Sequence, residues 1–482
     1  MMQKLHYKFI LAATTILVWL VFITSFRQNF NSNSKPLNLI IISIDTLRPD
    51  HMGVYGYDKN TTPNIDAWAK DAIVFSNMHT IIPATYPSFA ILQTGMHPLE
   101  SMIINNGVVN GRVYKTGPPI RDQVNTLAEI LKNNGYKTAA FLTNPVLEKS
   151  YTNLDQGFSE YYLKSVWDGY PDRTNYLTLL NNALTWISDN KNEKIYLWIH
   201  LMDPHAPYTP NTEYECKFNE NYCSEIKSKG FLKLDDERKK YEGCQKEDLQ
   251  QEKIDVIETL YDGTIATSDD FVGKILKKIQ DSGLDKNSVV LLYGDHGEGF
   301  ENQYYFTHSH AIYESSTRIP FLAKIPNQKV RIVENLLDNT SIFPFLLNAL
   351  NLKTTPDKKS SNPWNSINPK DSRDNYIYAF NTNLSKYSIQ NQDYKFIYSI
   401  PGFACLNKGQ KEELYDLKKD PSESINLLIE KPEITNRFKT SLLNYFRNYG
   451  LPKPLNNEAL DVEYNSPEEI KKTIEILKNV GY

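Results

Sequence analysis

The stretch Gly294-Asp295-His296-Gly297-Glu298-Gly299 follows directly after an apolar run from Ser288 to Tyr293. That run predicts a buried strand, which ends with an Asp and a His side by side. Carboxylate oxygen and imidazole nitrogen are ligands that a divalent cation of the Zn²⁺ or Mn²⁺ type accepts. Open α/β sheets bind their ligands at the carboxyl ends of parallel strands. Taken alone, however, the stretch is more typical of a tight turn with a helix-capping Asp.

A second stretch of the same kind decides between these interpretations. The β-branched run from Leu39 to Ile44 indicates another strand that is buried on both faces, and Asp45 follows it directly. Two strands that each end in an acid predict an α/β fold with a metal site at the strand ends. We expect Asp45, Asp295 and His296 to hold one cation there.

Thr85 is the candidate nucleophile. It precedes Pro87 in a stretch that ends at Gly95, and Pro is favoured at the first position of a helix, as Gly is just past the last. We therefore expect a short helix starting near Pro87, with Thr85 at its N-terminus, where free N–H groups and the helix dipole favour an anion. A cation beside Thr85 would also make its hydroxyl easier to deprotonate and would be bound by it. The alternative is that Thr85 only caps the helix.

Six motifs follow one another along the chain. In order they are Asp45-Thr-Leu-Arg48, Tyr55-Gly-Tyr-Asp58 with Thr62-Pro-Asn-Ile-Asp66, Thr85-Tyr-Pro-Ser88, Asp203-Pro-His-Ala-Pro-Tyr208, Gly294-Asp-His-Gly-Glu298, and the ending from Glu413 to Leu427. This order resembles the sulfatase family of the alkaline phosphatase superfamily. The resemblance implies an α/β fold: a large mixed, mostly parallel sheet sandwiched by helices, with a small C-terminal α+β subdomain.

The position of Thr85 departs from the family pattern. Family sulfatases carry a Cys or Ser there, which is oxidised to formylglycine, and an Arg where this chain has Phe89. An unmodified Thr is instead a mark of phosphate-processing relatives: nucleotide pyrophosphatases, phosphoethanolamine transferases and lipoteichoic-acid (glycerophosphate) synthases. In those relatives the corresponding Thr both binds the metal and attacks phosphorus. The resemblance thus implies the same two roles for Thr85, and it favours phosphate-ester chemistry.

Histidines near other strand ends complete the candidate site. The apolar run from Ile195 to His200 predicts a strand that leads into Asp203 and His205. The resemblance implies that His205 faces the substrate or binds a second cation, and that His310, or less favourably His308, acts on the leaving group. We expect His205 or His310 to protonate the departing oxygen, since imidazole titrates near neutral pH. The cofactor would be one or two Zn²⁺, Mn²⁺ or Ca²⁺ ions, and the candidates for a second ion or for the substrate are Asp203, His205, His308 and His310.

The N-terminus carries a predicted membrane anchor. Residues 9–26 are uncharged, and at about 1.5 Å per residue they are just long enough to cross the hydrocarbon core of a membrane. No small-residue cleavage pattern follows, so we expect an uncleaved helix and not a removed signal. Lys4 and Lys8 against Arg27 favour an inside N-terminus and a periplasmic or extracellular catalytic domain.

Composition changes predict three parts. Residues 1–36 form the anchor and a polar tether, residues 37–355 the catalytic domain, and residues 375–482 a subdomain with antiparallel strands and a terminal helix. A loop rich in Ser, Asn, Pro and Lys after Pro356 marks the second boundary. Within the catalytic domain we expect a capped helix that ends at Gly135, a strand at residues 137–142 and a long helix at residues 254–280.

Charge and cysteines narrow the function further. The net charge of −4 argues against bulk attraction to nucleic acid. Cys216, Cys223 and Cys244 lie in a polar segment, residues 208–248, which we interpret as a long loop. In an oxidising compartment we expect one disulfide within this segment, with the remaining Cys able to pair with Cys405.

The sequence therefore predicts a membrane-anchored, metal-dependent hydrolase of sulfate or phosphate esters, with a small-molecule, lipid or glycan substrate. A transferase of phosphoethanolamine or glycerophosphate is the alternative, although that class usually carries several membrane spans. A catalytically silent binding protein on the same fold is the second alternative. The presence of Asp45, Asp295 and His296 argues against it.

Overall fold

The computed structural model describes residues 37–104, 118–164, 174–245, 248–302, 304–352, 376–400 and 410–448. The chain divides into two compact units, Met1–Leu37 and Asn38–Tyr482, and every element named below belongs to the second. The anchor predicted at residues 9–26, its tether and the boundary loop after Pro356 lie outside the described residues and stay predictions. In the described part of the chain, no helix combines the length and the apolar character that a membrane crossing requires.

Nine of the described strands form one large sheet in the order β11-β2-β10-β7-β1-β5-β3-β4, with β12 beside β2. The strands are β1 (Asn38–Ile44), β2 (Ile73–His79), β3 (Lys137–Leu142), β4 (Glu160–Leu163), β5 (Ile195–Leu201), β7 (Ser288–Gly294), β10 (Arg318–Lys324), β11 (Arg331–Val333) and β12 (Leu337–Asp338). Only β10 runs antiparallel to its neighbours, β2 and β7. The expected large mixed, mostly parallel sheet is therefore confirmed.

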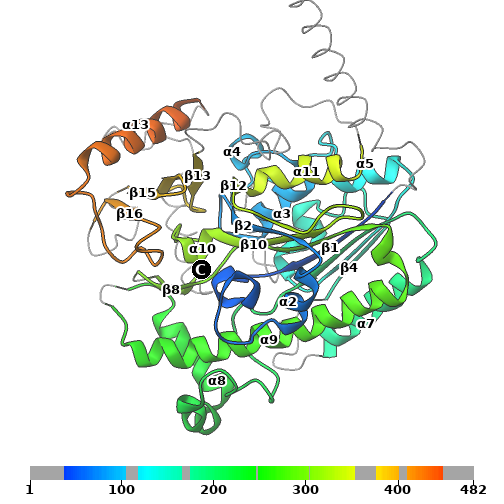
Figure 1. Cartoon of the computed structure of the whole chain (residues 1–482), viewed down its shortest axis with the longest axis horizontal. Helices are drawn as coiled ribbons and strands as arrows, with labels where there is room; N and C mark the ends of the chain where they lie inside the picture. The colour runs from blue at the N-terminus through cyan, green and yellow to red at the C-terminus, as the bar shows by residue number, and fades with distance from the viewer. Residues whose placement is uncertain are drawn as a thin grey trace, which may run out of the picture. The chain divides into compact units, whose positions relative to one another are not determined.

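Helices cover both faces of this sheet: Figure 1 shows α7 and α9 below it and α3, α5 and α11 above it. The helices are α2 (Pro63–Ala69), α3 (Thr85–Thr94), α4 (Pro98–Ser101), α5 (Leu127–Asn133), α6 (Lys149–Thr152), α7 (Thr174–Asp189), α8 (Cys223–Tyr241), α9 (Gln251–Asp281), α10 (Glu314–Thr317), α11 (Ile342–Ala349) and α13 (Pro432–Asn448), with short 3-10 turns between them. Alternate residues of β1 (Ile40, Ile42 and Ile44) pack in one buried cluster with α7 and α9. Burial on both faces explains why β1 is a continuous apolar run.

The register of the central strands brings the ends of β1, β5 and β7 together. Ser43 on β1 pairs with His200 on β5, and Ile44 pairs with Gly294 on β7. Both pairings are parallel, so the residues that follow Ile44 and Gly294 leave the sheet side by side at its carboxyl edge. This register gathers the acids that the sequence placed after two separate strands.

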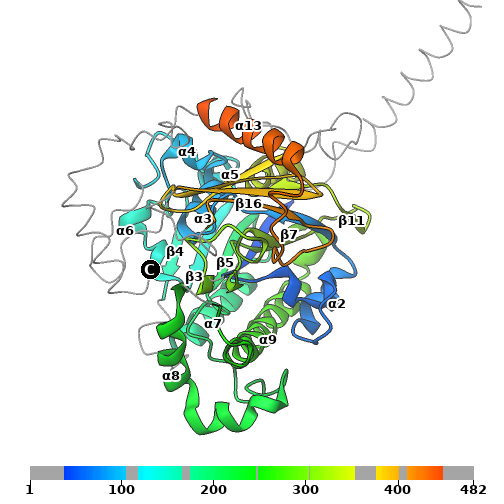
Figure 2. The ribbon, with the colours of Figure 1, turned by 90° about the vertical axis from the view of Figure 1, so that its left-hand side faces the viewer.

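A second sheet of four antiparallel strands follows in the chain: β13 (Ile377–Phe380), β14 (Lys386–Gln390), β15 (Tyr394–Ser399) and β16 (Glu412–Asp416). Helix α13 lies across it (Figure 2) and packs Phe438, Leu442 and Phe446 against it. The same buried cluster includes Ile81 and Ile82 of the catalytic domain, so the two sheets share apolar contacts. The small C-terminal α+β subdomain of the expected fold is thus present.

A buried charged cluster also joins the two sheets. Lys395 on β15 lies 3.2 Å from a carboxylate oxygen of Glu314 on α10 and 3.2 Å from one of Glu423. His79 at the end of β2 lies 3.0 Å from Glu314. Burial, opposed by Lys395 and reinforced by Glu314, raises the pKa of Glu423 to about 8. Because two carboxyl groups share one ammonium group, Glu423 keeps its proton at neutral pH.

Replacing Glu423 by Gln should therefore remove a pH dependence of stability. Between the ordinary pKa of 4.5 and the folded pKa of about 8, the folded chain holds a proton that the unfolded chain has lost. The free energy of unfolding of the parent must then fall as the pH rises through this window. Gln does not titrate, so Glu423→Gln should lose roughly 4 kcal/mol less than the parent between pH values of about 5 and 9. Urea unfolding at both pH values measures this, with the exposed Glu430→Gln as control, and an equal loss in parent and Glu423→Gln would contradict it.

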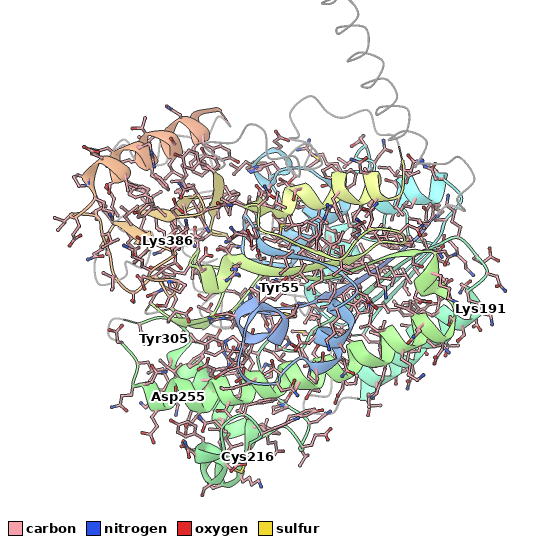
Figure 3. The ribbon with its side chains drawn as sticks, viewed as in Figure 1. Tyr55, Lys191, Cys216, Asp255, Tyr305 and Lys386 are labelled. Carbon is pink, nitrogen blue, oxygen red and sulfur yellow. A yellow bond between two sulfur atoms is a disulfide. The ribbon has the colours of Figure 1, made fainter. Side chains whose placement is uncertain are left out.

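The segment that we interpreted as a long loop contains helix α8, so this interpretation was wrong. The helix has few apolar residues, and ion pairs one turn apart support it: Lys229 with Glu225, Lys239 with Asp235 and Arg238 with Glu242. Gly230 interrupts it with a φ of 70°. One disulfide was expected within this segment, and it joins Cys216 to Cys223. Cys216 is labelled near the bottom of Figure 3. A third small sheet, β6 (Gly243–Cys244), β9 (Tyr304–Thr307) and β8 (Gly299–Glu301), follows α8.

Candidate metal and ester site

Asp45, Asp295 and His296 meet at the carboxyl edge of the large sheet. His296 Nε2 lies 3.7 Å from Asp45 Oδ1 and 3.5 Å from Asp295 Oδ2, and all three side chains are fully buried. Their ligand atoms lie within 4.8 Å of one another. The grouping predicted from two strand ends is therefore present in the fold.

The donor atoms of this group fit a divalent cation. Within the described part of the chain, Asp45 Oδ1 and Asp295 Oδ2 have no hydrogen-bond partner, although both are buried. His296 Nδ1 lies 2.9 Å from the carbonyl oxygen of Gly297 and donates to it, which leaves the lone pair on Nε2. Buried, unpaired carboxylate oxygens carry a large desolvation cost that a bound cation would remove.

The pKa shifts of Asp45, Asp295 and His296 are consistent with a cation site. Burial, with a contribution from Asp45, raises the pKa of Asp295. Burial also raises the pKa of Asp45, but the interaction with His200 and the charges of His205 and His296 lower it further, and the result lies below the ordinary value. Burial, followed by the charge of His308, lowers the pKa of His296 to about 3. His296 is therefore a neutral imidazole, as a metal ligand must be.

Thr85 lies beside the same group. It is the first residue of α3, preceded by Ala84 as N-cap, so the helix begins two residues earlier than we expected and Thr85 is not its cap. Its Oγ1 atom lies 3.2 Å from His296 Nε2. Ser88, one turn later, donates to the carbonyl oxygen of Asp295 at 2.7 Å and ties α3 to the end of β7. The hydroxyl thus stands at a helix N-terminus and next to the candidate cation ligands.

The second carboxylate oxygen of Asp45, Oδ2, is held by Asn144 and His200. Asn144, which follows β3, donates from Nδ2 to Asp45 Oδ2 at 2.5 Å, and His200 Nε2 lies 3.4 Å from the same oxygen. Ser43 Oγ accepts from Trp198 Nε1 at 2.9 Å and lies 3.0 Å from His200 Nδ1. His200 thus bridges the Ser43 hydroxyl, which faces Nδ1, and Asp45 Oδ2, which faces Nε2. These contacts leave Asp45 Oδ1 directed at the candidate cation.

The backbone turn after Asp45 is strained, and it places an N–H group against the carboxylate of Asp295. Thr46 has a φ of 51°, which is rare for a β-branched residue. Its N–H donates to Asp295 Oδ1 at 3.2 Å. Tyr261 on α9 holds this turn, because its hydroxyl donates to the Thr46 carbonyl at 2.6 Å and accepts from the Arg48 N–H at 3.1 Å. The turn therefore orients the second carboxylate.

His308 stands beside the metal group. Its ring centre lies 4.2 Å from that of His296 and 5.2 Å from that of His205. His308 Nδ1 lies 3.2 Å from Glu298 Oε1, while Tyr208 donates to Glu298 Oε2 at 3.0 Å. Among the described residues, His308 Nε2 has no partner. Burial lowers the pKa of His308, but Glu298 raises it further, so the imidazole is charged more readily than usual.

The remaining candidates lie near this site with different surroundings. Burial lowers the pKa of His205, and burial followed by His308 lowers the pKa of His310 to about 4. Asp203 is buried, and its carbonyl accepts a hydrogen bond from Ser268 on α9. Among the described residues, Asp45, Asp295 and His296 are the one group of three acids or imidazoles with ligand atoms this close together. Asp203, His205, His308 and His310 do not form a second group of this kind among the described residues, and a second cation stays a prediction.

Sequence reasoning missed three contributors. Asn144 could have been found, because it follows the predicted strand at residues 137–142 as Asp45 follows its own. Glu298 belongs to the quoted motif, yet its spacing alone does not reveal that it binds His308. Tyr208 also ends a quoted motif, and its contact with Glu298 spans a long stretch of chain.

Comparison with known proteins places this geometry in a family. The family model described as Sulfatase matches residues 37–352, most of the chain. The chain belongs to the sulfatase family. A second model, described as the C-terminal part of N-sulphoglucosamine sulphohydrolase, matches residues 301–447. The resemblance seen in the motifs is therefore confirmed at the level of the family.

Individual relatives of this sulfatase-family chain are distant but extensive. An arylsulfatase of Clostridium perfringens is 24% identical over 457 residues, which cover 82% of this chain and 90% of the relative. An ulvan-active sulfatase of Formosa agariphila is 25% identical over 436 residues, covering 83% and 78%. The chain is thus a sulfatase-like ester hydrolase.

Solved structures share its fold. A protein of the glycosaminoglycan-metabolism locus of Bacteroides thetaiotaomicron has a TM-score of 0.67 at 21% identity, covering 87% of this chain and 98% of its own. The phosphonate monoester hydrolase of Agrobacterium radiobacter has a TM-score of 0.62 at 18% identity, covering 88% and 98%. At these identities the similarity shows that the fold is shared.

Proposed function

We propose that this protein hydrolyses sulfate esters, with Thr85 as the nucleophile and one divalent cation held by Asp45, Asp295, His296 and the Thr85 hydroxyl. The observation that carries the proposal is the position of Thr85 Oγ1, 3.2 Å from His296 Nε2 and at the N-terminus of α3. Sulfatase relatives that cover most of the chain support the choice of a sulfate ester. The membrane anchor and the extracytoplasmic location stay part of the proposal, and the Cys216–Cys223 disulfide supports an oxidising compartment.

A bound divalent cation supplies positive charge that lowers the pKa of a nearby hydroxyl and offsets the charge on the ester oxygens. Thr85 Oγ, after losing its proton to solvent, bonds to sulfur as the ester S–O bond breaks. His308, whose pKa is raised by Glu298, gives its Nε2 proton to the departing alkoxide. Water then attacks the same sulfur, its proton returns to His308, and the bond to Thr85 breaks to release hydrogensulfate.

His308 replaces His310 as the acid in this scheme. We had favoured His310, together with His205, but burial lowers the pKa of both. A neutral imidazole is a far weaker acid than an imidazolium, so neither His205 nor His310 is suited to protonate the leaving group. Of the three, only His308 has a pKa above the ordinary value, because Glu298 outweighs burial, and its Nε2 atom is buried beside His296. His205 and His310 are then suited to accept hydrogen bonds from the substrate or the attacking water.

Phosphate-type esters are the second candidate. The observation that favours them is the hydroxyl of Thr85 itself, which stands where sulfatases carry a residue converted to formylglycine. An unmodified hydroxyl attacks phosphorus in relatives of this superfamily, and the same fold serves the phosphonate monoester hydrolase of Agrobacterium radiobacter. The two candidates share Thr85 and the metal group and differ in the ester that the pocket accepts.

A substrate panel separates these candidates. The full-length protein in detergent is assayed with 4-nitrophenyl sulfate, 4-nitrophenyl phosphate, bis(4-nitrophenyl) phosphate and a phenylphosphonate ester, each with Zn²⁺, Mn²⁺ or Ca²⁺. We expect kcat/KM for one ester class to exceed the others by at least about a hundredfold, because an enzyme stabilises one transition state best. Release of the aryl alcohol only when an acceptor alcohol is added would indicate the transferase instead. No turnover of any ester with any ion would overturn the enzymatic proposal.

A further inference from the structure

Residues 304–313, called here the histidine segment, run between the catalytic sheet and the small C-terminal sheet. The segment carries His308 and His310. On one side it meets the metal group through His308, whose ring lies 4.2 Å from that of His296. On the other side, Ile312 and Tyr313 pack with Ile397 and Tyr415 of the small sheet. Its position is therefore determined by both parts of the protein.

The turn between β13 and β14 holds the backbone of this segment. Thr382 donates twice to the carbonyl oxygen of Ser309, from its N–H and from Oγ1, both at 3.1 Å. Asn381 donates from Nδ2 to the carbonyl oxygen of His310 at 3.2 Å. Ser309 and His310 are the two residues directly after His308. The small sheet thus binds the backbone that carries both imidazoles.

The turn between β13 and β14 is also held by hydrogen bonds of its own. Asn381 Oδ1 accepts from the N–H groups of Ser385 and Lys386, both at 2.9 Å, and its Nδ2 donates to Ser385 Oγ at 3.0 Å. Asn381 and Thr382 are 1% and 7% exposed. Buried donors of this kind are costly to leave unpaired, so the carbonyls of the histidine segment are held firmly.

Two further contacts fix the ends of the histidine segment to the same sheet. The Lys386 ammonium group, labelled in Figure 3, lies 4.9 Å from the ring centre of Tyr304 and 5.6 Å from that of Tyr313. Tyr313 also donates from its hydroxyl to Glu413 on β16 at 2.9 Å. The segment is thus bound to the small sheet at both ends as well as at its centre.

We propose that Asn381 and Thr382 are positioning residues for the ester site, acting through the backbone of Ser309 and His310. The proposal rests on the proposed function, since it assigns these residues to the placement of imidazoles that act on the ester. The small C-terminal sheet then contributes to catalysis, because it positions these imidazoles. A misplacement of about 1 Å far from the reacting atoms can lower a rate by about a hundredfold, so two lost hydrogen bonds at this place should be measurable.

Paired variants isolate these hydrogen bonds. Thr382→Val removes the hydroxyl donor while keeping the shape, and Thr382→Ser restores the donor. Asn381→Asp keeps an oxygen for the N–H groups of Ser385 and Lys386 but loses the donor to the His310 carbonyl and to Ser385 Oγ. The control is Asn391→Asp in the turn between β14 and β15, where the Asn oxygen accepts from Asp393 and Tyr394 and does not touch the histidine segment.

Two readouts follow for each variant. The first is kcat and KM on the best ester of the panel, with Mn²⁺ affinity measured by calorimetry. We expect kcat to fall by about tenfold in Thr382→Val and Asn381→Asp, with Mn²⁺ affinity matching that of Thr382→Ser and Asn391→Asp at a temperature at which every variant is folded. The second readout needs no activity: the NMR signals of ¹³Cε1-labelled histidines, assigned by single His→Asn replacements. We expect the signals of His308 and His310 to move, and that of His51 to stay.

Each outcome decides the matter. Unmoved His308 and His310 signals overturn the proposal whatever happens to kcat. Moved signals with an unchanged kcat also overturn it, because the placement then has no consequence for the reaction. If the parent protein turns over no ester, the proposed function fails on the substrate panel, and the NMR signals alone decide whether the turn places the imidazoles.

Discussion

Replacing Thr85 by Ala should lower kcat/KM by on the order of 10⁴- to 10⁶-fold, the scale of loss when a hydrolase loses a catalytic residue of its nucleophilic machinery. The fold should tolerate the change, because Ala84 is the N-cap and Ala is a good helix former at the first position of α3. Mn²⁺ should still bind, since Asp45, Asp295 and His296 remain. A large loss of rate with a small loss of affinity would identify Thr85 as the attacking group.

The matched variant is Thr85→Ser, which keeps a hydroxyl at the same place and should retain activity within about a hundredfold of the parent. Acid-quenched turnover followed by mass spectrometry should show the added mass of sulfate or phosphate on the peptide that carries Thr85. This mass also tells the two ester classes apart. Activity in Thr85→Ala equal to that of the parent would contradict the assignment of Thr85 as the nucleophile.

The fold was predictable because its strands carry strong local signals. The runs at residues 39–44, 137–142, 195–200 and 288–293 became β1, β3, β5 and β7 with ends within one residue. A strand that is buried on both faces must be apolar throughout, so the signal does not depend on distant partners. The helix expected at residues 254–280 was found at Gln251–Asp281 for a similar reason, since one face of it is continuously apolar.

Helix α8 could not be predicted in this way. Its stability comes from charged pairs one turn apart and from buried Arg238, which contacts the carbonyl of Phe306. It lacks the apolar stripe that marks an amphipathic helix. A polar segment with three cysteines is typical of a loop, and only tertiary contact distinguishes the two.

The candidate site was predictable where one strand end supplies each residue, and unpredictable where the contact is long-range. Asp45, Asp295 and His296 follow strands whose parallel pairing forces them together. His308, in contrast, gains its importance from Glu298, which raises its pKa, and from the adjacent ring of His296. Neither contact leaves a pattern in the sequence. The choice between His308 and His310 therefore needed the coordinates.

Removing the charge of Asp295 should weaken the response of the protein to metal. In the parent without a cation, Asp45 and Asp295 face each other in a buried site, and burial together with Asp45 raises the pKa of Asp295. Adding Mn²⁺ should stabilise the parent by about 2.7 kcal/mol at a hundred times its dissociation constant, and chelation should abolish both this gain and the activity. Asp295→Asn should bind Mn²⁺ at least about a hundredfold more weakly, because even residues behind the ligands contribute 10- to 100-fold.

The metal-free variant should be at least as stable as the metal-free parent, and this part of the prediction distinguishes a cation site from an ordinary buried acid. In Asp295→Asn the new side chain keeps one oxygen to accept from the N–H groups of Thr46 and His296, as Asp295 Oδ1 does now. Its amide would then donate toward Asp45 in place of a repelling carboxylate. The exposed Asp281→Asn serves as control and should respond to Mn²⁺ and to chelation as the parent does. Were metal-free Asp295→Asn clearly less stable than the metal-free parent, the carboxylate would be stabilising the fold by itself, and these three residues would not be a site built for a cation.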